Sequence, residues 1–196
     1  MLTKKEAEEI MHLEGEVRTV TLCTDAASVV RLKGKDGLNR VEAKLQSLGH
    51  PIDYGTMRAM DWRPLGLRVL SLLVIKDTFE WGDGEIRAMG YAALTYSLVT
   101  RLFMKTLASP DIAFGRAPIY WSSHFTSGKM EVEFVNGLNR VSFLIREFGG
   151  HPVLCKHIEG YLERAGQFIM PKHNVRLRET KCPFQGEPYH QYDLSW

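Results

Sequence analysis

The stretch "RETKCPFQGEPYH", Arg178 to His190, decides how the end of the chain folds. It places Glu179, Cys182 and His190 around one short turn, in a chain that has only three cysteines. Each of these three side chains can bind a metal such as zinc, and each also occurs as an ordinary surface residue. Which of the two applies depends on whether a fourth ligand exists elsewhere in the chain.

The segments on both sides of this turn alternate polar and apolar residues, as half-buried strands do. One face of the first strand carries Val175, Leu177 and Glu179. One face of the second carries His190, Tyr192, Leu194 and Trp196. If Val175 pairs with Leu194, then Glu179 pairs with His190 and both face the core. A carboxylate buried beside an imidazole is costly, unless the two pair with each other or share a metal with Cys182.

The helix expected over "HPVLCKHIEGYLERAGQFI", residues 151–169, precedes this hairpin and offers the fourth ligand. The candidates are Cys155, His151, His157 and His173. Cys155 is favoured, because it lies beside the apolar stripe of the helix and therefore on its inner side. In the alternative interpretation, the two cysteines are a small buried apolar residue and a loop thiol, and Glu179 with His190 is an ordinary cross-strand pair.

The rest of the chain has helices first and strands last. Apolar residues at spacings of three and four predict helices over 26–48, 64–79 and 81–107, the last capped near Asp83, and a shorter helix with a proline in its path over 109–125. We expect an α+β fold, in which a helical N-terminal half precedes a four-stranded antiparallel sheet packed on helices. Residues 1–80 and 81–196 are expected to form two regions of one continuous domain.

The first hairpin is predicted over "KMEVEFVNGLNRVSFLIREF", residues 129–148. Asn136-Gly137 is a favoured type I′ turn, because both residues tolerate a positive φ. A two-residue loop pairs Glu133 with Arg140 and Met130 with Phe143, so that charge meets charge and apolar meets apolar.

Composition limits the classes of function. The 196 residues are 44% hydrophobic and carry a formal net charge of +2, which is too small to argue for nucleic acid. No run of about 18 apolar residues is present, so no membrane span is expected. The first residues read as an amphipathic helix and not as a signal peptide. We therefore expect a cytoplasmic protein whose cysteines, including a buried structural Cys23, are reduced.

The pattern Cys155-x4-Gly160, then Glu179-x2-Cys182, then His190 resembles the 4-vinyl-reductase (4VR) domain. That family includes hydrocarbon-binding sensor domains of phenol-responsive activators, and it is related in fold to TRAPP vesicle-tethering subunits and to haem-based nitric-oxide sensors. The resemblance covers roughly 81–196. It implies a zinc ion held by Cys155, Glu179, Cys182 and His190, where His190 stands in place of the cysteine usual in the family. Because four protein ligands leave no open position, such a zinc is structural.

The resemblance also implies an apolar cavity between the helices and the sheet, and a sensor that binds a small hydrophobic or aromatic ligand. We expect Tyr96, Phe103 and Trp121 in its wall. His124 is either the polar contact for a ligand's hydroxyl or carboxylate, or a histidine in water at a helix end. The resemblance further implies a homodimer, or a partner protein that receives the signal.

Three alternatives remain open at this point. One is a TRAPP-like scaffold with a filled core. The second is an enzyme related to vinyl reduction, although the chain has no nicotinamide or flavin fingerprint. The third is a haem protein with His151 or His157 as the axial ligand, although the Tyr-x-Ser-x-Arg motif of the haem sensors is absent.

Overall fold

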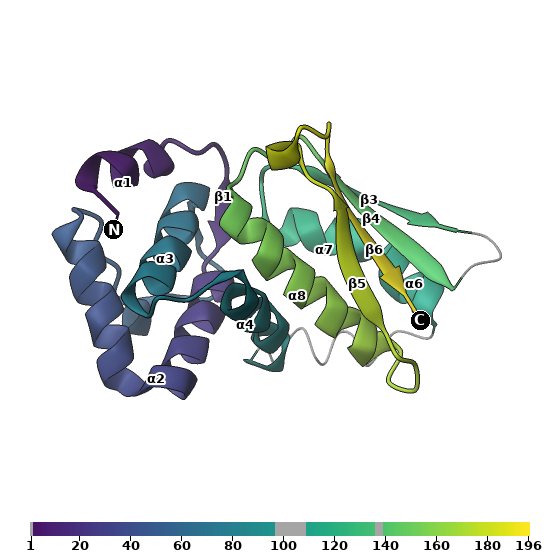
Figure 1. The fold of residues 1–196 in the computed structure, drawn as a ribbon, viewed down its shortest axis with the longest axis horizontal. Coiled ribbons are helices and arrows are strands. Elements are labelled where there is room, and N and C mark those ends of the chain that lie inside the picture. Colours follow the sequence, from purple (N-terminus) through teal and green to yellow (C-terminus); the bar gives the residue numbers. More distant parts are fainter. Residues whose placement is uncertain (1, 97–108, 136–138) are drawn as a thin grey trace.

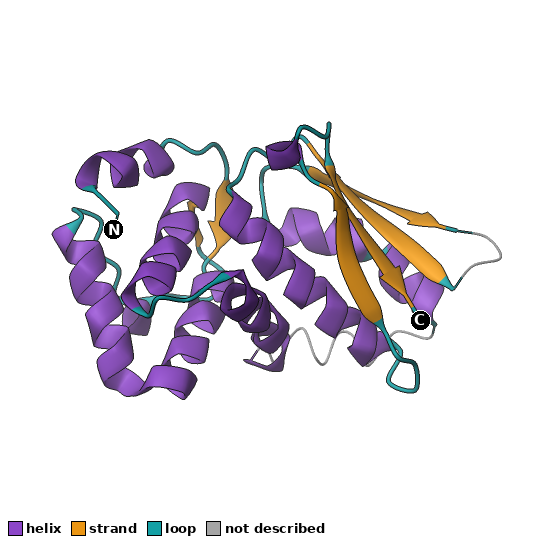
Figure 2. Cartoon of the chain, in the orientation of Figure 1, coloured by secondary structure: helices purple, strands orange, loops and turns teal. Residues whose placement is uncertain are grey.

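The computed structural model describes residues 2–96, 109–135 and 139–196. The helices are α1 (Lys4–Met11), α2 (Val20–Ser47), α3 (Leu65–Thr78), α4 (Asp83–Tyr96), α6 (Pro110–Gly115), α7 (Ala117–His124) and α8 (Pro152–Ile169), with short 3-10 turns η1 (Tyr54–Thr56) and η2 (Pro183–Gln185). The strands are β1 (Glu16–Arg18), β2 (Trp62–Pro64), β3 (Lys129–Phe134), β4 (Arg140–Arg146), β5 (Arg176–Lys181) and β6 (His190–Ser195). The expected α+β architecture is confirmed (Figures 1 and 2).

The molecule has a helical part and a sheet part, and α8 runs between them (Figure 1). Helices α1 to α4 lie on one side of α8, and the sheet packs on its other side. The buried apolar residues form one connected core that takes members from both parts. Among the described residues, none of the helices combines the length and the apolar character needed to cross a membrane.

The main sheet is antiparallel with strand order β3-β4-β6-β5, so the two predicted hairpins join side by side through β4 and β6. Strand β6 alternates buried and partly exposed side chains, whereas β4 is buried along its whole middle from Val141 to Ile145. A second, two-stranded sheet of β1 and β2 was not predicted, because each strand has three residues and so no readable periodicity.

The predicted pairing of the first hairpin is wrong by two residues. Glu133 lies opposite Ser142 and not Arg140, and Met130 lies opposite Ile145 and not Phe143. The connection is longer than two residues, since the Val135 amide donates to the Arg140 carbonyl. The predicted Asn136-Gly137 turn lies outside the described residues. Because the shift is an even number, every side chain keeps its predicted face.

The predicted pairing of the last hairpin is also wrong by two residues. Glu179 lies opposite Tyr192 and not His190, and Leu177 lies opposite Leu194. An irregularity between Glu179 and Lys181 and the turn η2 lengthen the connection. Glu179 and His190 are therefore diagonal neighbours on the same inward face, within reach of each other.

The predicted helices are confirmed with changes at their ends. Helix α2 begins at Val20, and Gly34 (φ 71°) kinks it. The segment 109–125 is two helices, because the chain breaks at Arg116 and Pro118 sits in the first turn of α7. The predicted long helix from 81 is described as α4 up to Tyr96, and its continuation over 97–107 lies outside the described residues.

Helices α4 and α8 approach each other closely at two glycines. A Cβ on Gly90 would lie 1.9 Å from the His157 carbonyl oxygen, and one on Gly160 would lie 1.9 Å from the Arg87 carbonyl oxygen. Arg87 then pairs with Glu159 on α8 at 3.4 Å. This contact fixes α8, the helix on which both of the sites below depend.

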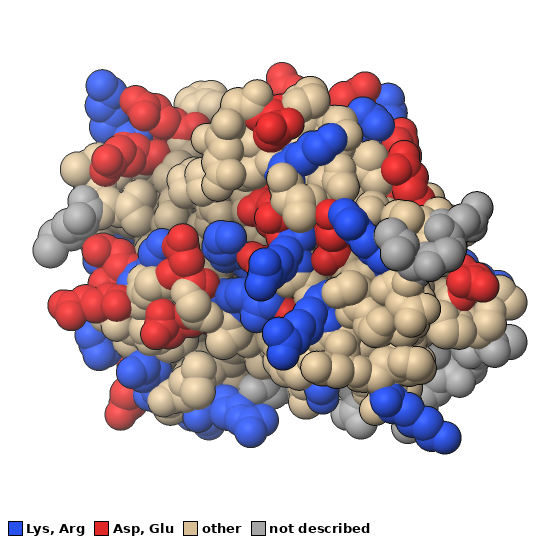
Figure 3. All heavy atoms as spheres, turned by 45° about the vertical axis from the view of Figure 1, so that its right-hand side comes forward, with Lys and Arg blue, Asp and Glu red and all other residues tan. Residues whose placement is uncertain are grey.

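Charged side chains of both signs cover the surface. On the face shown in Figure 3, basic side chains gather in the centre, with acidic side chains close to them. The chain has 25 Lys and Arg against 23 Asp and Glu. Neighbouring charges of opposite sign therefore cancel much of the field at a distance.

Candidate metal centre and interior cavity

The four predicted metal ligands come together where α8 meets the last hairpin. Cys155 projects from the first turns of α8, Glu179 from β5, Cys182 from the residue before η2, and His190 from the start of β6. One ligand atom from each lies within 4.8 Å of every other. Of the four residues, only Glu179 is not fully buried.

Three of the distances within this cluster are close to the donor spacing around one tetrahedral ion. The Cys155 and Cys182 sulfurs lie 3.9 Å apart, and the Cys155 sulfur lies 3.8 Å from His190 Nδ1. His190 Nδ1 lies 3.2 Å from Glu179 Oε1. Zinc bonds of about 2.3 Å to sulfur and about 2.0 Å to nitrogen or oxygen, at tetrahedral angles, place donors about 3.3–3.8 Å apart. The cluster could therefore hold one metal ion.

Electrostatics favours a cation at this position. Burial raises the pKa of the Cys155 thiol, and the nearby Glu179 carboxylate raises it further. Burial also raises the pKa of Cys182. For Glu179, burial acts to raise the pKa, but hydrogen bonds from His190 and Cys182 outweigh it and the net shift is downward. A divalent ion would let both thiols ionise and would leave one net negative charge, which Lys156 Nζ, 3.8 Å from Glu179 Oε2, offsets.

The other candidate ligands lie elsewhere. The His151 ring accepts the Val153 amide at 3.1 Å and caps α8, and His173 is exposed in the loop before β5. His157 hydrogen bonds to Asp25. Cys23 is half-buried and not fully buried as expected, and it lies outside the cluster.

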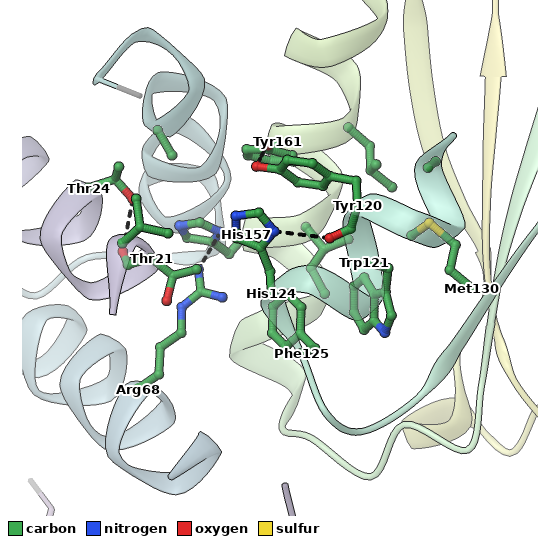
Figure 4. A pocket seen from close by; sticks show the side chains of 15 residues that line it. Thr21, Thr24, Arg68, Tyr120, Trp121, His124, Phe125, Met130, His157 and Tyr161 are labelled. Atoms are coloured by element: carbon green, nitrogen blue, oxygen red, sulfur yellow. Dashed lines mark hydrogen bonds between the residues drawn. The ribbon is translucent and has the colours of Figure 1, made fainter. Parts of the chain in front are cut away.

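An interior cavity lies between the helical part and the sheet part, with a volume of about 90 Å³. Side chains from α2, α3, α4, α7, α8 and β3 line it, and most of them are apolar or aromatic (Figure 4). Trp121 and His124, two of the four predicted pocket residues, are in the wall. The side chain of Tyr96 and all of Phe103 lie outside the described residues.

Two side chains of the cavity wall, Arg68 and His157, hydrogen bond to the buried Asp25, and the sequence analysis missed this set. Asp25, Arg68 and His157 are at most 3% exposed. His157 Nε2 lies 2.8 Å from Asp25 Oδ1, Arg68 Nε lies 3.4 Å from Asp25 Oδ2, and Arg68 Nη2 lies 3.2 Å from His157 Nδ1. We call these three residues the buried network. A signal for it existed, since Asp25 and Arg68 each interrupt an apolar run of a helix.

The buried network is electrically balanced. Burial acts to raise the pKa of Asp25, but the charges and hydrogen bonds of His157 and Arg68 lower it overall. Burial lowers the pKa of His157, so its ring is neutral at pH 7. His157 Nε2–H then donates to Asp25, and its Nδ1 accepts from Arg68. One carboxylate and one guanidinium cancel, while Arg68 Nη1 has no hydrogen-bond partner among the described residues.

His124 presents a hydrogen-bond acceptor to the cavity. Its Nδ1 lies 3.0 Å from the Tyr120 carbonyl oxygen and 2.9 Å from Ser123 Oγ. Because the Ser123 hydroxyl donates its own proton to the Tyr120 carbonyl at 2.7 Å, both neighbours of Nδ1 are acceptors and Nδ1 carries the proton. Burial lowers the pKa of His124, and the ring stacks on Tyr120 at 4.2 Å. In the neutral ring Nε2 keeps its lone pair, and the ring lies among the cavity-lining side chains in Figure 4. Trp121 contributes its ring face only, because its Nε1 donates to two backbone carbonyls at 3.1 Å.

Several solved structures with a similar fold are H-NOX proteins. An H-NOX protein from S. oneidensis in the Fe(II)NO state aligns with a TM-score of 0.67 and 12% identity, over 91% of this chain and 98% of that one. An oxygen-binding H-NOX domain related to soluble guanylate cyclases aligns with a TM-score of 0.62 and 11% identity, over 89% of this chain and 92% of that one. At such identities the likeness shows the fold alone.

Two other comparisons give nothing. No protein-family model matches the sequence, and no curated protein matches it. The structural alignments with H-NOX proteins confirm the relation in fold to haem-based nitric-oxide sensors that the 4VR resemblance implied. The 4VR assignment itself stays a prediction.

Another similar structure comes from a study of haem redox potential and porphyrin distortion. It aligns with a TM-score of 0.65 and 9% identity, over 91% of this chain and 99% of that one. Whether a haem fits this chain depends on the size of the cavity and on a free histidine. The described cavity has a volume of about 90 Å³, whereas sites for ligands of that size measure about 300–1,000 Å³. His157 has both ring nitrogens engaged within the buried network, and His151 caps α8. The described residues do not fit a haem.

Proposed function

We propose that this chain is a sensor domain that binds a small, mainly apolar molecule in the interior cavity and is stabilised by a zinc ion at the four-residue cluster. The observation that carries the proposal is an apolar cavity whose wall includes two polar side chains, His124 and Arg68. Ligand sites combine an apolar lining with a few placed polar groups in this way.

The cavity's size limits the ligand. A dry cavity of about 150 Å³ is enough to bind benzene. The volume of about 90 Å³ is smaller than this, so a single substituted ring enters only when the wall shifts on binding. A hydroxyl on the ligand would donate to His124 and accept from Arg68. A carboxylate would add an unbalanced charge, because Asp25 already neutralises Arg68.

The test of ligand binding uses four matched compounds: toluene, 4-methylphenol, 4-methylanisole and 4-methylbenzoate. Calorimetry should find the phenol tightest, because only it offers a donor and an acceptor without a charge. His124→Leu should reduce the preference for the phenol over toluene about tenfold, which corresponds to one hydrogen bond. His173→Leu, in the exposed loop, is the control and should change nothing. Equal affinity for all four compounds, or for none, would contradict the proposal.

Zinc is the ion that the donor set favours. Two thiolates, one imidazole and one carboxylate form a tetrahedral set, and sulfur donors disfavour magnesium and calcium. All four positions are filled by protein groups, so the ion would be structural. Elemental analysis should give about one zinc per chain, and Cys182→Ser should lower it sharply. Cys23→Ser should leave the zinc content unchanged, and a loss there would mean that the wrong thiols are assigned.

The output of the sensor would pass to a second copy of the chain or to a partner protein. Light scattering with and without 4-methylphenol measures the first possibility. The small volume of the cavity also favours a second function, a scaffold subunit with a filled core. Mass spectrometry of the purified protein separates the two: an extractable small molecule supports the sensor, and a covalent acyl chain supports the scaffold.

A further inference from the structure

Tyr192 carries a polar group that the structure leaves without a partner. Its side chain is 0% exposed, in the middle of β6. The hydroxyl is among the buried polar atoms of the described residues that have no hydrogen-bond partner. Buried hydroxyls are nearly always paired, so an unpaired one calls for an explanation such as an ion or group that completes the site.

The position of Tyr192 puts this hydroxyl at the metal cluster. Tyr192 lies opposite Glu179 in the pairing of β5 and β6, and both side chains face inward. Its ring is stacked with that of His190 at 6.3 Å. A tyrosine hydroxyl has an ordinary pKa of about 10, so it is protonated at neutral pH and can donate.

Metal binding would change the hydrogen bonds of Glu179. Without an ion, Glu179 Oε1 accepts from His190 Nδ1 at 3.2 Å. With an ion, both of these atoms become ligands, so His190 no longer donates to the carboxylate. The groups left to hold Glu179 are Lys156 Nζ, 3.8 Å from Oε2, and the Tyr192 hydroxyl.

We propose that Tyr192 is a positioning residue of the metal centre, whose hydroxyl donates to Glu179 when the ion is bound. The inference rests on the metal site of the proposed function. A donor at this place would hold the carboxylate to one bond with the ion and so favour four-coordinate zinc over ions that take more oxygen ligands. Removing a hydrogen-bond partner of a metal ligand typically lowers metal affinity about 10–100-fold.

Tyr192→Phe tests the proposal, because it removes only the hydroxyl oxygen. Zinc affinity, measured by competition with a chromophoric chelator, should fall by about 10–100-fold. The metal-free variant should melt at the same temperature as the wild type or higher, because an unpaired buried polar atom is gone. With Co²⁺ in place of zinc, the variant's visible spectrum should weaken as the carboxylate gains a second bond to the ion.

Tyr54→Phe is the matched control. The Tyr54 hydroxyl is also buried, but it pairs with Ser71 Oγ at 2.6 Å. Its loss should lower the melting temperature of the metal-free protein and leave zinc affinity unchanged. The two substitutions are thus expected to have opposite effects on the two measurements.

Two results would overturn the inference, and only the second would also overturn the proposed metal site. If the wild type binds zinc and Tyr192→Phe binds it equally well, the role of Tyr192 is wrong and the metal site stands. If the wild type binds neither zinc nor Co²⁺, the proposed metal site itself is wrong, and the role of Tyr192 is lost with it.

Discussion

The metal cluster and the buried network are both sets of polar side chains held by α8, yet they are completed in different ways. Cys155 belongs to the metal cluster, and His157, two residues further along α8, belongs to the buried network. The buried network satisfies its own charges with Asp25 and Arg68. The metal cluster leaves buried polar atoms of His190 and Tyr192 unpaired. The contrast is that the buried network balances its own charge, whereas the metal cluster could be completed by a cation.

The largest effect should come from removing the ion. Binding of structural zinc is worth about 10 kcal/mol or more, so a strong chelator should lower the melting temperature by well over ten degrees. The buried network needs no ion, so the chelator should lower the melting temperature of Asp25→Ala by as many degrees as that of the wild type. Differential scanning calorimetry measures both. An unchanged melting temperature with the chelator would remove the distinction between the two sets.

Breaking the buried network should have the next largest effect. Asp25→Ala leaves the Arg68 charge buried and unpaired, which typically costs about 3–5 kcal/mol. Asp36→Ala is the control on the same helix, since Asp36 is exposed; its effect should stay within about 0.5 kcal/mol. Urea unfolding of the zinc-loaded proteins gives both values. Equal stabilities of the two variants would mean that the network contributes nothing.

The close contact of α4 and α8 supports both sets. Gly160→Ala places a methyl group on the Arg87 carbonyl and should cost about 1–3 kcal/mol by overpacking. It should also weaken zinc binding, because α8 carries Cys155. Gly84→Ala, on α4 with open space around it, is the control and should be neutral or slightly stabilising. A destabilised Gly160→Ala protein with unchanged zinc affinity would show that the cluster tolerates movement of α8.

The smallest expected effect is the pH dependence of the buried network. Burial holds the pKa of His157 below its ordinary 6.5, so the unfolded chain takes up this proton first and stability falls as pH drops below 6.5. The pKa of Asp25 is lowered from 3.8, so its contribution is present above 3.8 and lost as pH falls further. Both shifts make acid destabilising.

His157→Gln should flatten the upper part of this dependence between pH 7.5 and 5.5, because the variant has no imidazole to protonate on unfolding. Urea unfolding at the two pH values, on wild type and variant, measures it. The metal cluster also loses stability in acid, but it does so in both proteins and cancels in the difference. An identical slope for the two proteins would place the acid sensitivity outside the buried network.

The metal cluster was predictable from sequence because it is nearly local. Three of its members lie between Glu179 and His190, and the period-two pattern of strands fixed their face even though the register was wrong by two residues. The buried network was not predicted, because Asp25, Arg68 and His157 are far apart in the chain and meet only through helix packing. A single charged residue in an apolar helix does not show which distant residue it will pair with. The sequence likewise predicted the α+β class but not the order in which the two hairpins join.

The most direct test of the central claim, that four side chains converge on one ion, is X-ray absorption at the zinc edge of the purified protein. The account predicts two sulfur neighbours at about 2.3 Å and two nitrogen or oxygen neighbours at about 2.0 Å, with one sulfur lost in Cys182→Ser. A first shell without sulfur, or a protein that carries no zinc when purified without chelator, would contradict it.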